Sequence, residues 1–221
     1  MLGRGPEAAP NSLWRETAEP FALASPRSLP AHADAVIIGA GYTGLWTALH
    51  LLRECPEMTV VVLERTHVGF GASGRNGGWA SALFPTSLDR VAKFSSRASA
   101  IAMQQAMYRV VDELDEWATE EGIEFDYAKG GTITVARNDA QLQTLHSDVK
   151  HDLSWGATTQ DVSLLDREST LAHIAMTNTL GGKFTPHCAA IHPLKLVHGL
   201  ARAVERRGGV IVEGVTALSY S

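Results

Sequence analysis

Three glycines at fixed spacing mark the part of the chain whose residue types suggest chemistry. They are Gly39, Gly41 and Gly44, in the segment Gly39-Ala40-Gly41-Tyr42-Thr43-Gly44. The first glycine of such a pattern permits a tight turn, the second lets a phosphate approach bare backbone, and the third lets a helix pack closely on a strand. The N–H groups that begin the following helix attract phosphate oxygens. The spacing therefore predicts a turn that binds a pyrophosphate.

An acidic residue completes this pattern further along the chain. Glu64 follows the apolar residues 59–63 and comes 20 residues after Gly44. A carboxylate at this place accepts hydrogen bonds from the ribose hydroxyls of adenosine. It also repels a 2′-phosphate, although neighbouring Arg65 weakens that argument. The turn and Glu64 together predict an ADP-containing cofactor, and they do not distinguish FAD from NAD.

The elements around the turn are those that such a site needs. Residues 35–38 are an apolar, β-branched run that meets the first glycine, which is typical of a strand buried in a parallel sheet. Residues 42–53 have apolar side chains at helical spacing, and Pro56 ends that helix. Residues 59–63 are a second buried strand. Strand, helix and strand within about 30 residues make one βαβ unit.

A glycine-rich segment follows the second strand. Residues 68–78 hold five glycines, too many for a helix, and the segment is too long for a tight turn. Such a loop brings backbone N–H groups against a ligand, with Ser73, Arg75 and Asn76 as side-chain donors. On spacing alone, a flexible surface loop without a ligand is the alternative.

These residues support a family resemblance. Residues 34–78, with their segments GAGYTGLWTALHLL, VVVLE and GFGASGRNGGW, resemble the D-amino-acid oxidase superfamily of FAD-dependent oxidoreductases, and within it the gamma-glutamylputrescine oxidase-like branch. A weaker likeness continues through residues 130–132 and 190–194. The resemblance implies an α/β fold, in which a Rossmann-like, glutathione-reductase-type FAD-binding domain holds an inserted α+β substrate domain with an antiparallel sheet. It also implies FAD as the cofactor and oxidation of a C–N bond of an amine or amino acid by hydride transfer to the flavin.

The resemblance assigns cofactor contacts as well. The glycine turn and the acidic residue bind the ADP half, and the glycine-rich loop runs under the FAD toward the flavin ring. The predicted cofactor-binding residues are Gly39, Gly41, Tyr42, Thr43, Gly44, Glu64, Arg65, Ser73, Gly74, Arg75, Asn76, Gly77 and Gly78. No catalytic residue is predicted, because Arg75 is only a guess for a base or for a clamp on a substrate carboxylate.

The remainder of the chain predicts alternating helices and strands. Residues 99–121 form an amphipathic helix that Gly122 ends. Residues 123–127 alternate apolar and polar side chains, and with residues 132–136 they predict a strand pair of an antiparallel sheet. A helix capped at Asn138 or Asp139 follows, and Pro193 begins another before a strand at residues 210–212.

Domain boundaries follow from these elements and from the resemblance. We expect a flexible N-terminal arm over residues 1–33, whose aromatic side chains dock on the domain surface, and the FAD-binding βαβ unit with its loop over 34–95. Part of a substrate domain is expected over 96–190, and a return to the FAD-binding domain over 191–221. Because the chain stops inside the alternating run 215–220, a truncated protein is expected. The alternatives are a non-catalytic remnant with an incomplete FAD site and an exposed sheet edge and, more weakly, an NAD-binding protein.

Composition narrows the partners. With 221 residues, a net charge of −5 and a pI near 6.0, the chain has no basic field for nucleic acid, so a small-molecule amine or amino acid is the expected partner.

Two distant cysteines indicate neither disulfides nor zinc, and no apolar run is long enough to span a membrane, so a cytoplasmic location is expected. Three histidines, His187, His192 and His198, lack ligand spacing or an acidic partner, and no metal is predicted. His192 is interpreted as a helix-entry residue, and the oligomeric state is left open.

Overall fold

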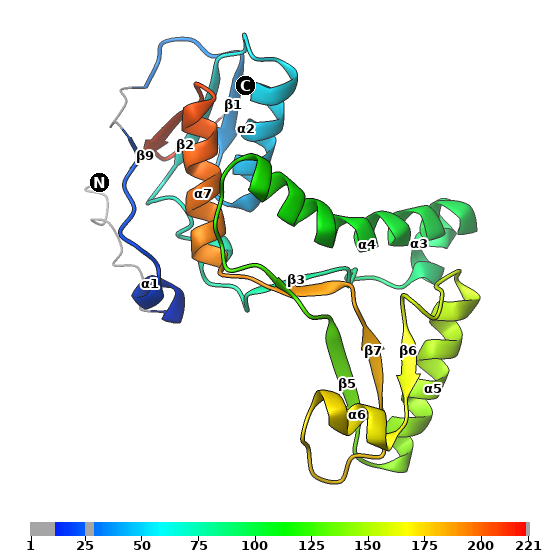
Figure 1. Cartoon of the computed structure of the whole chain (residues 1–221). Helices are drawn as coiled ribbons and strands as arrows, with labels where there is room; N and C mark the ends of the chain where they lie inside the picture. The colour runs from blue at the N-terminus through cyan, green and yellow to red at the C-terminus, as the bar shows by residue number, and fades with distance from the viewer. Residues whose placement is uncertain (1–11, 25–28, 220–221) are drawn as a thin grey trace. The chain divides into compact units, whose positions relative to one another are not determined.

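The computed structural model describes residues 12–24 and 29–219 (Figure 1). The chain divides into two compact units, of which the first comprises Met1–Gly78, Trp117–Tyr127 and Ile191–Ser221. The second comprises Trp79–Glu116 and Ala128–Ala190, and so interrupts the first in sequence. The predicted domain boundaries at residues 33, 95 and 190 stay a prediction. The parts of the predicted arm at residues 1–11 and 25–28, and Tyr220 of the alternating run, lie outside the described residues.

The first unit contains a parallel sheet of three strands, in the order β1-β2-β9. These strands are β1 (Ala35–Ile38), β2 (Val60–Glu64) and β9 (Val210–Glu213). Helix α2 (Tyr42–Glu54) joins β1 to β2, and α7 (Pro193–Arg206) precedes β9. The two helices pack against each other and against the sheet (Figure 1). Their contact faces and the middle of the sheet form a core of fully buried side chains: Leu45, Ala48, Leu49, Val62, Val197, Leu200, Val204 and Ile211.

Local sequence explains both helices. The predicted βαβ unit is confirmed, with α2 beginning directly after Gly41 and ending one residue before Cys55. In α7, Pro193 occupies the first turn, where its missing N–H leaves no hydrogen bond unmade. The preceding His192 caps the helix, since its Nδ1 accepts a hydrogen bond of 3.2 Å from the Lys195 N–H. The interpretation of His192 as a helix-entry residue is therefore confirmed.

A short helix and an irregular segment complete the first unit. Helix α1 (Leu13–Thr17) lies within the expected arm and packs against α7. The predicted strand over residues 123–127 is wrong, because no strand forms there. Gly122 takes a left-handed conformation, and the carbonyl of Phe125 accepts a hydrogen bond from the N–H of His192 at 2.7 Å. Ile123 and Phe125 are buried, so their alternation reflects docking of an irregular segment rather than sheet pairing.

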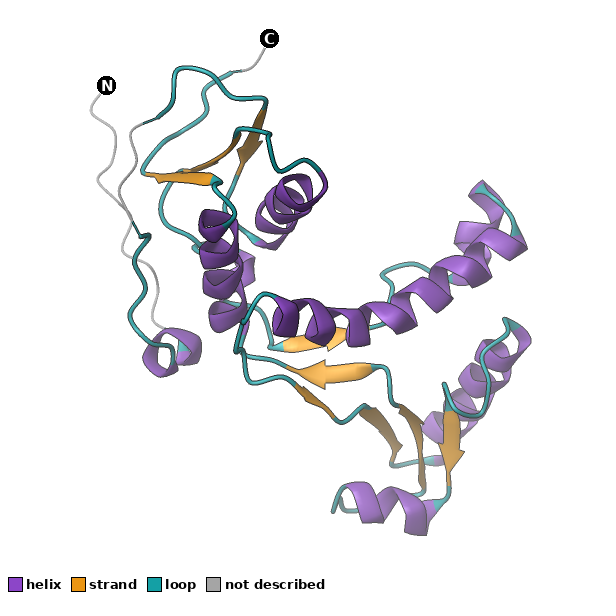
Figure 2. Ribbon diagram, turned by 45° about the horizontal axis from the view of Figure 1, so that its top comes forward, coloured by secondary structure: helices purple, strands orange, loops and turns teal. Residues whose placement is uncertain are grey.

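The second unit holds two antiparallel sheets of three strands (Figure 2). One has the order β3-β8-β4, with β3 (Trp79–Ser81), β8 (Cys188–Ala190) and β4 (Ala128–Lys129). The other has the order β5-β7-β6, with β5 (Thr132–Ala136), β7 (Gly181–Thr185) and β6 (Ser163–Leu165). The predicted strand at 132–136 therefore exists, but its partner is β7 and not the segment before it.

Four α-helices accompany these sheets. They are α3 (Leu88–Phe94), α4 (Arg97–Glu120), α5 (Asp139–Ser154) and α6 (Arg167–His173), and the last turn of α4 is counted with the first unit. Helices α5 and α6 pack on the sheet β5-β7-β6. The expected cap of α5 is Asn138, whose side chain accepts a hydrogen bond from the Gln141 N–H at 2.9 Å. No helix among the described residues is long and apolar enough to cross a membrane.

Candidate cofactor site

The glycine turn connects the end of β1 to the start of α2. Gly39 has a φ of +102°, a conformation that glycine adopts without strain, and its N–H donates to the Leu63 carbonyl at 2.7 Å. At Gly44 an added Cβ would lie 2.0 Å from the Gly39 carbonyl oxygen. The third glycine is thus required because the first turn of the helix touches the turn before it, as its position in the pattern predicts.

Glu64 ends β2 beside this turn. One carboxylate oxygen accepts the Ala40 N–H at 2.9 Å, and the other accepts the Thr66 N–H at 2.9 Å. A carboxylate offers about four lone-pair sites, so each oxygen keeps capacity for a further donor. The predicted acidic residue is therefore fixed against the glycine turn and retains acceptors for hydroxyl groups.

Ser73 joins the glycine-rich loop to the start of α2. Its hydroxyl oxygen accepts the Tyr42 N–H at 2.9 Å. An added Cβ at Gly41 would lie 2.9 Å from the same oxygen, whereas one at Gly39 would meet nothing within 4 Å. The turn therefore presents open space beside Gly39 and a single polar group beside Gly41. The structure brings together two segments that the sequence predicts to share one ligand.

The loop itself is compact and depends on close backbone approach. A short 3₁₀ turn, η1 (Ala72–Gly74), forms within it. Gly69 and Gly78 both have positive φ values, of +70° and +74°. An added Cβ at Gly74 would lie 2.3 Å from the Gly69 carbonyl oxygen, so the loop folds back on itself where Gly74 meets Gly69. The glycines thus allow a compact loop with close backbone contacts, rather than a flexible one.

Asn76 holds the end of the loop. Its Oδ1 accepts the Gly78 N–H at 2.9 Å, and its Nδ2 donates to the Ser73 carbonyl at 3.2 Å. Nδ2 also lies 3.5 Å from the Tyr42 hydroxyl, which donates to the Pro193 carbonyl at 2.9 Å. Burial raises the pKa of Tyr42 to about 12, so this hydroxyl stays protonated and keeps its role as a donor. Asn76 therefore links the loop to the first residues of both α2 and α7.

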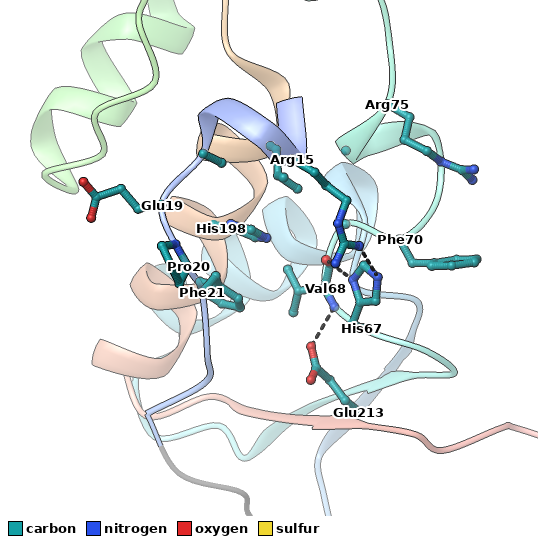
Figure 3. Close-up of a pocket in the computed structure, with 14 residues that line it drawn as sticks. Arg15, Glu19, Pro20, Phe21, His67, Val68, Phe70, Arg75, His198 and Glu213 are labelled. Carbon is teal, nitrogen blue, oxygen red and sulfur yellow. Dashed lines mark hydrogen bonds between the residues drawn. The ribbon is translucent and has the colours of Figure 1, made fainter. Parts of the chain in front are cut away.

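The remaining predicted residues lie at the surface. Thr43, Arg65 and Gly77 are exposed, and nothing lies within 4 Å of a Cβ added at Gly77. Arg75 is exposed too, with its Nε donating to the Gly71 carbonyl at 3.2 Å and its guanidinium 5.3 Å from the centre of the Phe70 ring. Figure 3 shows Arg75 on the same side of the close-up as Phe70. The Arg75 side chain is thus hydrogen-bonded to the backbone of its own loop.

Sequence reasoning expected the aromatic side chains of the N-terminal arm to dock on the domain surface, but it did not predict the two contacts that Glu213 and Trp14 make with the same loop. Glu213, at the end of β9, accepts the Val68 N–H at 2.7 Å, and Trp14 Nε1–H donates to the Asn76 carbonyl at 2.8 Å. The ring of His192 lies 5.0 Å from that of Trp14. The only signal for Trp14 in the sequence is an isolated aromatic residue in a segment rich in small residues. Nothing in the sequence relates Glu213 to the loop.

A pocket of about 410 Å³ lies on the first unit between the loop and the N-terminal segment (Figure 3). Its lining includes Arg15 and Phe21 from that segment, His67 just before the loop, Phe70 within the loop, and His198 from α7. None of the residues of the glycine turn lines it, and neither does Glu64. Two other predicted cofactor-binding residues, Gly74 and Arg75, do line it, so the pocket borders the glycine-rich loop and not the glycine turn.

The predicted residues fit the ADP half of FAD. The first N–H groups of α2 have no partners within the helix, and the Tyr42 N–H donates to the Ser73 hydroxyl. Glu64 lies beside them with free acceptor capacity, and the space beside Gly39 is open, since nothing lies within 4 Å of an added Cβ there. Pyrophosphate at the helix start and ribose hydroxyls at the carboxylate would satisfy these groups.

The three histidines considered as metal ligands have separate partners. His187 Nε2 lies 2.8 Å from Asp161 Oδ1, so the expectation that it lacks an acidic partner is wrong. His192 caps α7, and His198 stacks on Phe21 with ring centres 4.1 Å apart. Among the described residues no group of three or more His, Cys, Asp or Glu side chains is placed to hold a metal ion.

Comparison with known proteins gives relatives over most of the chain. Gamma-glutamylputrescine oxidoreductase of Escherichia coli is 33% identical over 190 residues, which cover 85% of this chain and 43% of that protein. The probable oxidoreductase OrdL of Haemophilus influenzae is 32% identical, with coverage of 82% and 41%. Human mitochondrial sarcosine dehydrogenase is 24% identical, with coverage of 85% and 19%. The chain thus spans less than half the length of these relatives.

Solved structures share the fold. An L-amino acid deaminase from Proteus myxofaciens superimposes with a TM-score of 0.70 at 19% identity, covering 88% of this chain and 41% of that one. A glycine oxidase from Geobacillus kaustophilus gives a TM-score of 0.64 at 22% identity, with coverage of 82% and 46%. At these identities the likeness concerns the fold alone. Residues 34–221 match the DAO family model, described as FAD dependent oxidoreductase, and the chain therefore belongs to this family, whose cofactor is FAD.

Proposed function

We propose that the chain is the cofactor-binding part of an oxidoreductase that oxidises a C–N bond of an amine or amino acid by hydride transfer to FAD. The relatives named gamma-glutamylputrescine oxidoreductase and sarcosine dehydrogenase support this substrate class, because both names contain an amine compound. The inserted second unit is proposed as part of the substrate domain. Since Cys55 and Cys188 are both free, the chain suits a reducing compartment, and a cytoplasmic location belongs to the proposal.

The observation that supports the proposal most strongly is the joint arrangement of Glu64, Ser73 and the start of α2. Glu64 binds the ribose hydroxyls of the adenosine, and the N–H groups of Gly41, Thr43 and Gly44 face the pyrophosphate, while Tyr42 contributes through the Ser73 hydroxyl that its N–H contacts. Residues 73–78 line the path toward the flavin, and Arg65 follows Glu64 at the adenosine end. Bound FAD supplies the electron-accepting ring, while the residues of the chain bind it and exclude water.

The proposal is tested on the purified 221-residue chain. After incubation with FAD and removal of the excess, we expect visible flavin absorbance close to one FAD per chain. The same treatment with NAD should leave no bound nucleotide. A colourless protein that is folded by circular dichroism would contradict FAD binding by this chain.

A second candidate is a non-catalytic remnant that needs a partner. Val36 and Ile38, on the edge strand β1, are 58% and 63% exposed, which leaves apolar sheet surface open to solvent. This candidate predicts a colourless chain that self-associates. Sedimentation velocity on the same sample distinguishes the two, because the first candidate predicts a flavin-bearing species with no concentration-dependent growth.

A further inference from the structure

Residues 12–24 form a segment, here called the N-terminal strap, that lies along the first unit. It begins with α1, whose cap is Ser12, and continues without helix or strand to Ala24. The N–H of Ala24 donates to both carboxylate oxygens of Glu205 in α7, each at 3.2 Å. The strap is therefore attached to α7 at its end, and its beginning contacts the end of the glycine-rich loop.

Trp14 makes the contact with that loop. Its Nε1–H donates to the Asn76 carbonyl at 2.8 Å, across 62 residues of sequence. An added Cβ at Gly78 would lie 2.9 Å from two atoms of the Trp14 ring. Gly78 thus needs glycine for three reasons: its φ of +74°, the Ile191 carbonyl oxygen 2.8 Å from the position of an added Cβ, and the approach of this ring. The indole thus packs against Gly78, the last residue of the loop before β3.

A chain of hydrogen bonds runs from Trp14 to the glycine turn. Asn76, whose carbonyl accepts from Trp14, donates through Nδ2 to the Ser73 carbonyl. Ser73 in turn accepts the Tyr42 N–H, the first N–H of α2. A shift of Asn76 is therefore expected to move the serine hydroxyl that lies where the pyrophosphate is proposed to bind.

A second network fixes the strap to α7 through His192. Because Nδ1 of His192 accepts from the Lys195 N–H, the neutral ring bears its proton on Nε2, which lies 3.0 Å from the Thr17 hydroxyl. That hydroxyl donates its own proton to the Leu13 carbonyl at 2.7 Å. Burial and, next, the charge of Lys195 lower the pKa of His192, which keeps the ring neutral as the network requires. Every polar atom named here has a donor or acceptor role.

The strap also contacts α7 and the residue just before the loop (Figure 3). Phe21 stacks on His198 with an angle of 12° between the rings, and Arg15 lies 3.3 Å from His67. The residues that make these contacts line the pocket described above. The strap is thus ordered by specific partners along its length, not only at Trp14.

We propose that the N-terminal strap is part of the cofactor site and that Trp14 is a positioning residue, which acts through Asn76 and Gly78 to hold the glycine-rich loop in the shape that receives FAD. The inference rests on the proposed function for its consequence, FAD affinity. Its structural core, that Trp14 orders the loop, is independent of the cofactor and has its own readout.

The test uses the full chain with Trp14→Phe, Trp14→Ala and the control Leu13→Ala. Phenylalanine keeps a ring beside Gly78 but removes the N–H donor, and alanine removes both. Leu13 lies on the same short helix and is exposed, so its truncation leaves the contacts of Trp14 unchanged. Amide hydrogen exchange is followed at Gly78 and Ile191 without cofactor, because the Ile191 N–H donates to the Gly78 carbonyl at 2.9 Å. FAD affinity is titrated in parallel.

We expect both Trp14 variants to exchange these amides faster than the wild type and the control, while amides in β2 are unchanged. We expect FAD affinity to fall about threefold to tenfold in Trp14→Phe, the range for one neutral hydrogen bond, and further in Trp14→Ala. Unchanged exchange at Gly78 and Ile191 in both variants overturns the inference, whatever the FAD result. Unchanged FAD affinity with faster exchange overturns the role in the cofactor site. If the wild type binds no FAD, the proposed function fails, and exchange alone decides whether Trp14 orders the loop.

Discussion

Glu64 and Glu213 lie side by side at the carboxyl ends of adjacent parallel strands, in register with one another. Each carboxylate accepts backbone N–H groups from the segment that follows a strand, but in different ways. Glu64 uses both oxygens, for Ala40 and Thr66, whereas one oxygen of Glu213 accepts from Val68. The pair therefore offers a matched comparison between a proposed ligand and a neighbour of the same chemistry.

Glu64→Gln should weaken FAD binding by about 1.5–3 kcal/mol, the scale for a hydrogen bond that involves a charged group. The amide nitrogen of glutamine cannot accept from Ala40 or Thr66, so part of the effect comes from a displaced turn. Glu213→Gln keeps one oxygen for Val68 and should change FAD affinity little. The affinities are measured by flavin fluorescence titration. Equal affinity in wild type and Glu64→Gln would remove Glu64 from the ribose.

Gly41→Val should abolish FAD binding, because its side chain would occupy the space of the pyrophosphate and would meet Ser73, whose Oγ lies 2.9 Å from the position of an added Cβ. Gly71→Ala is the control, since nothing lies within 4 Å of a Cβ at Gly71. Both variants are compared by equilibrium dialysis against FAD after circular dichroism confirms folding. Retained binding in Gly41→Val would show that the pyrophosphate lies elsewhere.

His198 should make the stability of the first unit depend on pH. Burial, followed by the charge of Arg202, lowers its pKa from 6.5 to about 4. The unfolded chain then binds more protons than the folded chain between these values, so stability is present above pH 6.5 and is lost as the pH falls toward 4. His198→Phe keeps an aromatic ring against Phe21 but removes the titration. We expect its unfolding free energy to fall less steeply over this range than that of the wild type, and an identical slope in urea unfolding would contradict the assignment.

Glu121→Ala should destabilise the fold by about 1.5–3 kcal/mol, the range for charge-assisted hydrogen bonds. Glu121 is only 8% exposed, and its Oε1 accepts from Arg207 at 2.6 Å and 3.0 Å. Arg206 also donates to the Glu121 carbonyl, so residues 117–127 are attached to the end of α7. Glu116→Ala, on the exposed side of α4, should change stability by less than about 0.5 kcal/mol. Equal midpoints for both variants in urea unfolding would show that this attachment contributes nothing.

The parts of the fold that the sequence predicts correctly are those that local physics determines. In the βαβ unit, Gly39 is needed for its positive φ, and Gly44 is needed because its backbone lies close to the Gly39 carbonyl, five residues earlier in the chain. The apolar residues of α2 are spaced so that they form the buried face of the helix. The cap at Asn138 and the entry at Pro193 are local in the same way. Such features can be predicted from the sequence without knowledge of distant partners.

Features that depend on distant partners were predicted wrongly or missed. Strand β5 pairs with β7, some 50 residues away, and not with the segment just before it, because alternation shows a half-buried strand but not its neighbour. The hydrogen bond from Trp14 to Asn76 and the pair of His187 with Asp161 likewise join segments that only tertiary packing brings together. The candidate site is therefore predictable in its glycine turn and Glu64, but not in the strap that covers its loop.

The central claim is that this chain binds FAD at the glycine turn, and the most direct measurement is an FAD titration of the wild-type chain with ADP as a competitor. We predict saturation near one FAD per chain and displacement of the FAD by excess ADP, because both share the pyrophosphate and the ribose that Gly41 and Glu64 are proposed to bind. Absence of saturable FAD binding by the folded chain, or FAD binding that ADP at saturating concentration does not reduce, would contradict the account.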